Sequence, residues 1–161
     1  MSEKPITLLD RLVPQSLDGN YRGHKAALWL LGIYVALKIV MSTNSIFNTE
    51  TVVVGADGIP VGTFGSEAAR AVLMLFSLMS LGQLILSLLA LASLLRWKAA
   101  VPFIYLVLIA EHVARRFIVI SYAVARPEGT PAGVYVNYAL LALLAAGLLL
   151  SLVPTGRRED P

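Results

Sequence analysis

The sequence predicts an all-α membrane protein, a four-transmembrane-helix antiparallel bundle with a small β-hairpin in the first outer loop. Hydrophobic residues make up 57% of the 161 residues and charged residues 14%, whereas soluble globular domains have roughly 45–50% and about 25%. The mean hydropathy is +0.75. This composition excludes a disordered chain, a coiled coil and a typical soluble enzyme.

Four apolar segments have the length that a membrane span requires. A helix needs about 20 mostly apolar residues to cross a hydrocarbon core of roughly 30 Å. A backbone that faces lipid must satisfy its own hydrogen bonds, which favours helices for these segments. The predicted spans are residues 26–42, 68–95, 99–125 and 134–153, and they define a membrane domain over residues 26–153.

The distribution of basic residues predicts the orientation of the spans. Cytoplasmic segments of membrane proteins carry an excess of Lys and Arg. We therefore expect a multi-pass protein of the plasma (inner) membrane with both termini in the cytoplasm. One side has Lys4, Arg11, Arg22, Lys25, Arg96, Lys98, Arg157 and Arg158, and the other side has only Arg70 and Arg126.

Two cytoplasmic tails flank the predicted membrane domain, residues 1–25 and 154–161. Within the first tail, Ile6–Val13 has apolar residues at helical spacing and is followed by Pro14. A short interfacial helix fits this pattern, and a mobile tail is the alternative.

The long first outer loop, residues 43–67, has the pattern of a β-hairpin. Thr51–Val54 is β-branched, Gly55–Gly58 is a turn sequence, and Ile59–Phe64 has alternating apolar residues. Because a hairpin alone is only marginally stable in water, this one is expected to rest on the outer end of the bundle. It is then either a lid over an outward-facing cavity or a plain connector.

The third predicted span carries ionisable residues, which are costly within a membrane and mark candidate functional sites. On a helix that turns about 100° per residue, Arg115 lies about 40°, His112 about 100° and Arg116 about 140° from Glu111. These side chains form one polar stripe, which should face the bundle interior or a partner. The alternative is a break at Glu111 followed by a surface helix, which leaves too few apolar residues for the remainder to cross.

The spans contain more positive than negative charge. Lys38 of the first span, Arg115 and Arg116 accompany a single carboxylate, that of Glu111. Glu111 and Arg115 are spaced i,i+4 and are expected to pair, and Lys38 is expected to snorkel toward the interface. At least one arginine therefore requires water, an anionic headgroup, an anionic substrate or an acidic residue of another subunit.

This excess of positive charge favours two functions. The first is binding or transport of an anionic amphiphile or a small anion through the polar stripe. The second is an accessory role in a larger membrane complex, in which an acidic partner helix pairs with the arginines. The candidate ligand-binding residues are Lys38, Gln83, Glu111, His112, Arg115, Arg116 and Asn137.

Other kinds of chemistry find little support in the sequence. The chain has no cysteine, which excludes disulfides and thiolate metal sites. No nucleophile–base pair or nucleotide-binding loop is recognisable, so no catalytic residue is assigned and an enzyme is the least favoured class. The basic residues form no patch of the kind that binds nucleic acid.

His112 has several interpretations. A haem ligand would require a second histidine at matching depth, but His24 lies before the first span at the opposite side. A metal shared with Glu111 is disfavoured because adjacent helical residues point about 100° apart. A proton relay through Glu111 and His112 remains open, as does a neutral imidazole bonded to Gln83 or a serine. We expect no metal and no cofactor.

Overall fold

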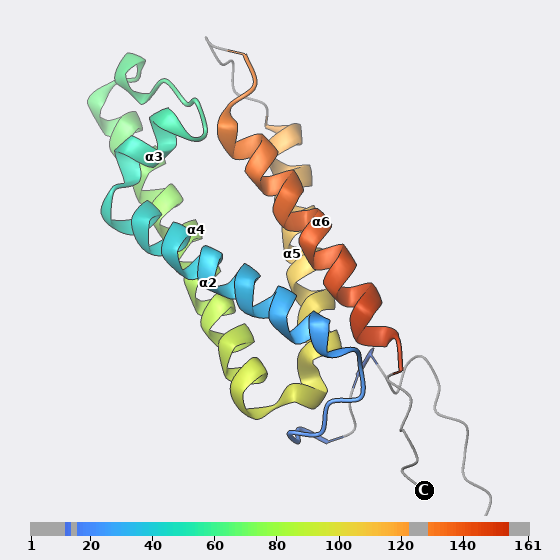
Figure 1. Cartoon of the computed structure of the whole chain (residues 1–161). Coiled ribbons are helices and arrows are strands. Elements are labelled where there is room, and N and C mark those ends of the chain that lie inside the picture. The colour runs from blue at the N-terminus through green and yellow to red at the C-terminus, as the bar shows by residue number, and fades with distance from the viewer. Residues whose placement is uncertain (1–11, 14–15, 123–128, 155–161) are drawn as a thin grey trace, which may run out of the picture.

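In the computed structural model, the described residues (12–13, 16–122 and 129–154) form helices and loops and contain no strand. The prediction of an all-helical protein is confirmed. Figure 1 shows the long helices side by side and a small helical segment beyond the end of the first. The long helices are α2 (Lys25–Phe47), α4 (Ser66–Arg96), α5 (Val101–Ser121) and α6 (Ala132–Leu152). The short elements are α3 (Thr49–Gly55) and the 3₁₀ turns η1 (Val61–Thr63) and η2 (Lys98–Ala100).

Three of these helices, α2, α4 and α6, are long and apolar enough to cross a membrane. The fourth long helix, α5, has 21 residues but carries Glu111, Arg115 and Arg116 close together. The structure therefore has the helices expected of a membrane protein.

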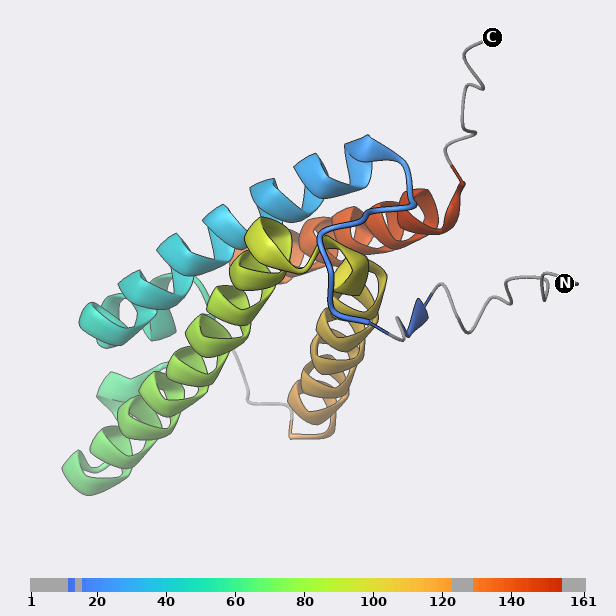
Figure 2. The same ribbon diagram turned by 90° about the horizontal axis from the view of Figure 1, so that it is seen from below.

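The helices pack in an order that differs from their order along the chain. α2 lies between α4 and α6 and packs against both, and α5 packs along α6. α4 and α5 diverge from the turn that joins them (Figures 1 and 2). We call the end of the bundle at this turn the inner end, and the opposite end, where α2 leads into α3, the outer end.

A strap of residues 16–24 ties the helices together at the inner end. The Ala99 N–H donates to the Asp18 carbonyl (3.2 Å), and the His24 N–H donates to the Leu150 carbonyl near the end of α6 (3.1 Å). The same end therefore holds the start of α2, the turn from α4 to α5 and the end of α6.

The apolar core occupies the inner half of the bundle. Tyr105 of α5 is fully buried there, and its hydroxyl donates to the Ala27 carbonyl of α2 (2.6 Å). Its ring lies against Gly147 of α6, where a Cβ would collide with it. The buried apolar residues of this core are Ala27, Leu31, Tyr34, Val35, Ala90, Val101, Tyr105, Leu108, Leu140 and Leu144.

The predicted β-hairpin in the first outer loop is wrong. The segment Thr51–Val54 belongs to helix α3, and Ile59–Phe64 contains the 3₁₀ turn η1. β-branched residues disfavour a helix only slightly, and burial of one face overrides that preference. Val53 is fully buried, and the Thr49 hydroxyl is hydrogen-bonded to that of Ser77 on α4 (2.8 Å).

The predicted turn at Gly55–Gly58 does follow α3. Gly58 has a φ of 66°, a conformation that glycine adopts without steric cost. The Ala56 carbonyl then accepts the N–H of Gly133 on α6 (3.0 Å). The loop is thus a helical segment at the outer end that contacts both α4 and the start of α6.

The helix bounds differ from the predicted spans by a few residues. α2 continues past Ser42 to Phe47, where the side-chain amide of Asn48 donates to Asn44 (2.8 Å). α5 begins at Val101, next to Pro102, because proline fits the first turn of a helix. The expected interfacial helix at Ile6–Val13, apart from its last two residues, and the tail beyond Pro154 lie outside the described residues.

Candidate functional site

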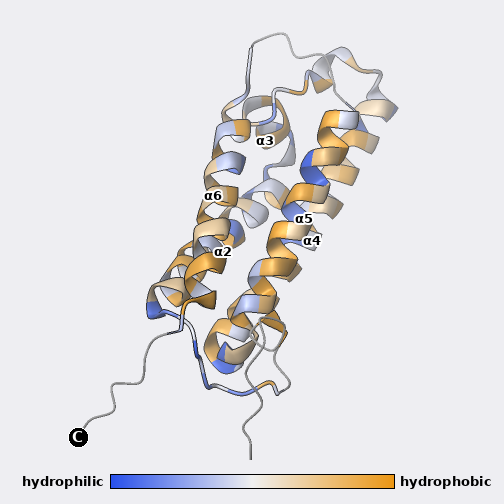
Figure 3. Ribbon diagram, turned by 90° about the vertical axis from the view of Figure 1, so that its right-hand side faces the viewer, coloured by the Kyte–Doolittle hydropathy of each residue, from blue (hydrophilic) through white to orange (hydrophobic). Residues whose placement is uncertain are grey.

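Polar side chains from all four long helices meet one turn beyond the apolar core, toward the outer end. Figure 3 shows helices of mainly apolar residues that are interrupted by a hydrophilic stretch on α5. We call the group of side chains gathered there the polar cluster. It consists of Tyr34, Lys38, Gln83, Glu111, His112, Arg115 and Asn137.

The carboxylate of Glu111 is the acceptor at the centre of the polar cluster. Its Oε1 accepts a hydrogen bond from Nε2 of Gln83 on α4 (2.5 Å) and one from Nε of Arg115 (3.1 Å). The predicted i,i+4 ion pair between Glu111 and Arg115 is therefore confirmed. Gln83 is buried. Its bond to Glu111 therefore links α4 to α5 in the interior of the bundle.

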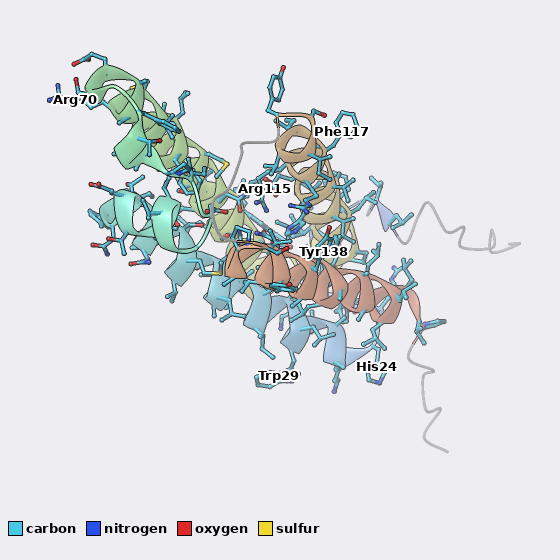
Figure 4. The ribbon with its side chains drawn as sticks, turned by 90° about the horizontal axis from the view of Figure 1, so that it is seen from above. His24, Trp29, Arg70, Arg115, Phe117 and Tyr138 are labelled. Carbon is cyan, nitrogen blue, oxygen red and sulfur yellow. The ribbon has the colours of Figure 1, made fainter. Side chains whose placement is uncertain are left out.

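Arg115 connects Glu111 to α6. Its two terminal nitrogens lie 3.4 and 3.5 Å from Oδ1 of Asn137, and one lies 3.3 Å from Nδ1 of His112. Asn137 is oriented by its own bond to the Gly133 carbonyl (2.7 Å). Figure 4 shows Arg115 directed into the space between α4, α5 and α6, whereas Phe117 points away from the bundle.

Lys38 and Tyr34 complete the polar cluster from α2. Both side chains are buried, and both lie within electrostatic range of Glu111 and Arg115. The ammonium of Lys38 has no hydrogen-bond or ion-pair partner among the described residues. The expectation that Lys38 snorkels to the interface is wrong, since only 7% of this residue is exposed.

Arg116 lies apart from these bonds, although it neighbours Arg115 in the chain. Its terminal nitrogen donates to the hydroxyl of Tyr138 on α6 (3.1 Å), and its guanidinium lies 5.1 Å from the centre of the Tyr138 ring. Its Nε is buried without a partner. Since neighbouring helical residues point about 100° apart, Arg115 and Arg116 contact different side chains of α6.

The polar cluster is unbalanced in charge. Of the two ion pairs among the described residues, Glu111–Arg115 lies in the cluster, and Glu67–Arg70 is exposed at the outer end. The cluster thus holds two cationic side chains, Lys38 and Arg115, and one carboxylate, whereas Arg116 lies beside it on Tyr138. The side chains of Arg115 and Glu111 remain 20% and 25% exposed.

The structure brings together six of the seven candidate ligand-binding residues and leaves Arg116 to one side. The expected bond from His112 to Gln83 or a serine is wrong, because His112 contacts Arg115 and Gln83 bonds Glu111. Two contributing tyrosines were not among the candidates. Tyr34 precedes Lys38 by one helical turn, and this spacing is a signal for it, whereas Tyr138 contacts Arg116 beside the cluster and has no such signal.

Two surface grooves lie near the outer end, and the polar cluster lines neither of them. One groove of about 400 Å³ lies between the α3–η1 segment and the start of α6. The other runs along the last turns of α2, beside Phe47. Both grooves are therefore separate from the polar cluster, in which Glu111, Arg115 and Asn137 are partly exposed.

Comparison with known protein families, with curated proteins and with solved structures finds no match for this chain. The function must therefore be argued from the geometry of the polar cluster.

Proposed function

We propose that this protein crosses the membrane four times and binds an anionic amphiphile or a small anion at the polar cluster, either to hold it or to transport it. The observation that carries the proposal is the excess of positive charge in the polar cluster, where Lys38 and Arg115 lie near a single carboxylate, that of Glu111. A charge left uncompensated in hydrocarbon costs about 2.5 kcal/mol or more. A bound anion would remove that cost.

Four crossings follow if α4 and α6 both span the bilayer. α4 ends at the inner end of the bundle, and α6 begins at the outer end, where Gly133 bonds Ala56. The chain between them, which includes α5, must then cross as well. The polar residues of α5 do not oppose this, because Glu111, His112 and Arg115 bond to other helices or to each other instead of facing lipid.

We propose that the protein lies in the plasma (inner) membrane with both termini in the cytoplasm. Arg22, Lys25, Arg96 and Lys98 lie at the inner end of the bundle and Arg70 at the outer end. By the positive-inside rule the inner end is cytoplasmic. The polar cluster then lies in the outer half of the bilayer, within reach of anions from the outer leaflet or the outer solution.

The chemistry of the polar cluster suits a carboxylate, sulfonate or phosphate. Guanidinium groups form paired, charge-assisted hydrogen bonds with such oxyanions, which an ammonium cannot reproduce. An amphiphile could approach between the diverging outer parts of α4 and α5 and leave its chain among the lipids.

The proposal is tested by binding of a fluorescent dodecanesulfonate to the protein in phosphatidylcholine nanodiscs. The wild type should bind, and Arg115→Lys should weaken binding about tenfold or more although the charge is kept. Arg70→Lys, at an exposed site of the outer end, is the matched control and should bind as the wild type does. Absence of binding to the wild type, or equal binding to Arg115→Lys, would contradict the proposal.

A second candidate function, an accessory subunit, is favoured by the position of Arg116. This side chain has no acidic partner among the described residues, and its bond to Tyr138 lies at an exposed position. An acidic residue on a partner helix could pair with it there. Loss of a co-purifying subunit on Arg116→Ala, with dodecanesulfonate binding unchanged, would favour this role over anion binding.

A further inference from the structure

Gln83 carries a buried hydrogen-bond acceptor that lacks a donor. The amide nitrogen of this residue donates to Glu111, but the carbonyl oxygen of the same amide, Oε1, is buried and has no partner. A buried acceptor without a donor costs about 1–3 kcal/mol. The neighbouring Glu111 cannot supply a proton while it is ionised, because a carboxylate is an acceptor only.

Protonation of Glu111 would supply the missing donor. A carboxylic acid and a primary amide can form two complementary hydrogen bonds, one from the amide N–H and one from the acid O–H. The protonated form of Glu111 would therefore satisfy both polar atoms of the Gln83 side chain. Protonation would also remove the negative charge that pairs with Arg115. Arg115 would keep its contacts to the side chains of Asn137 and His112.

We infer that Glu111 is a proton-binding site that couples proton uptake to anion binding at Arg115. A proton from the outer solution adds to the carboxylate, Glu111 turns to Gln83, and an anion takes its place against the guanidinium. This inference rests on the proposed anion-binding function. The groups around Glu111 are Tyr34 and Lys38 from α2, Gln83 from α4 and Arg115 on α5, and Arg115 in turn contacts His112 and, on α6, Asn137.

The coupling has a defined size and sign. If one proton is taken up with each anion, binding tightens about tenfold for each unit that the pH falls. The effect is reciprocal, since a bound anion must favour the protonated carboxyl by the same factor. Each binding event would thus bring one proton and one anion into the polar cluster.

The test measures the affinity for dodecanesulfonate, which stays ionised, in phosphatidylcholine nanodiscs between about pH 4.5 and 8.5. The wild type should show the tenfold slope, and calorimetry in two buffers should count about one proton taken up per anion. Glu111→Gln copies the protonated form, so it should bind at all pH values without a slope.

Two control variants separate Glu111 from other titrating groups. Glu67→Gln removes an exposed acid of α4 and should keep the wild-type slope. His112→Asn should also keep it, because His112 is not the proposed proton site. A slope that persists in Glu111→Gln, or one that disappears in His112→Asn, would overturn the inference.

The outcomes for the wild type distinguish the inference from the function on which it rests. Binding of dodecanesulfonate with the same affinity at every pH would refute the coupling and leave the anion site standing. Absence of binding at every pH, in the wild type and in Glu111→Gln alike, would refute the anion site and the coupling together.

Discussion

The side-chain amide of Gln83 donates a hydrogen bond to the carboxylate of Glu111, across two helices that diverge from a common turn. The same carboxylate oxygen accepts from Arg115, which in turn reaches Asn137 on α6. This chain of polar contacts connects α4, α5 and α6 in the half of the bundle beyond the apolar core. Glu111 is the acceptor that both Gln83 and Arg115 share, and its removal should be the most disruptive change.

We expect Glu111→Ala to destabilise the protein more than Arg115→Ala does. Loss of the carboxylate leaves Arg115 and Gln83 without their acceptor and the polar cluster without negative charge, at a cost on the order of 3 kcal/mol. Arg115→Ala leaves Glu111 bonded to Gln83. Thermal unfolding in detergent measures the difference. The control is Glu67→Ala, which breaks only the exposed pair with Arg70 and should change stability by at most about 1 kcal/mol. Equal losses of stability for Glu111→Ala and Arg115→Ala would contradict the prediction.

Gly147→Ala should destabilise the inner half of the bundle. The added Cβ would overlap the ring of Tyr105, which is fully buried and held by its bond to Ala27. Overpacking of this kind costs typically about 1–3 kcal/mol. The control is Gly82→Ala on α4, where a Cβ meets nothing within 4 Å. That change should not lower the melting temperature, because alanine favours a helix more than glycine does. If Gly147→Ala does not lower the melting temperature, α5 and α6 pack less closely than described.

Gly133→Ala should release the α3–η1 segment from α6. A Cβ at this position would lie 2.7 Å from the Ala56 carbonyl oxygen, the atom that accepts the Gly133 N–H. Backbone must shift to relieve the contact, so the hydrogen bond between the segment and α6 should be lost. Limited proteolysis of residues 49–65 should become faster while helix content is unchanged. In the same loop, Gly62→Ala has free space for its Cβ and should leave the proteolysis rate unaltered.

Four crossings predict that both termini lie on the same side of the membrane. Reporter fusions before Met1, after Pro161 and in the loop at Gly62 test this prediction. The two terminal fusions should report the cytoplasm and the loop fusion the outside. If α5 does not cross, the termini would report opposite sides, and an external signal from both termini would reverse the proposed orientation.

The helical character of the protein and its membrane-sized apolar segments were predictable from the order of the residues. Apolar runs such as residues 68–95 are long enough that only a helix satisfies their backbone in lipid. The pairing of Glu111 with Arg115 was also predictable, because i,i+4 residues of one helix are neighbours whatever surrounds them. The positions of the residues within the spans also indicated that Lys38 and Asn137 lie toward the outer end and Gln83 near the centre of its span.

Only the tertiary structure decided which partners those residues have. The local pattern of Thr51–Val54 suggested a strand, but burial of Val53 and contact with α4 make the segment helical. Helical spacing placed Arg115 and Arg116 on one stripe, yet they bond different side chains of α6, Asn137 and Tyr138. The physical reason is the same in each case. Spacing along the chain sets the direction of a side chain on its own helix, whereas the neighbouring helix, brought there by packing, sets what the side chain meets.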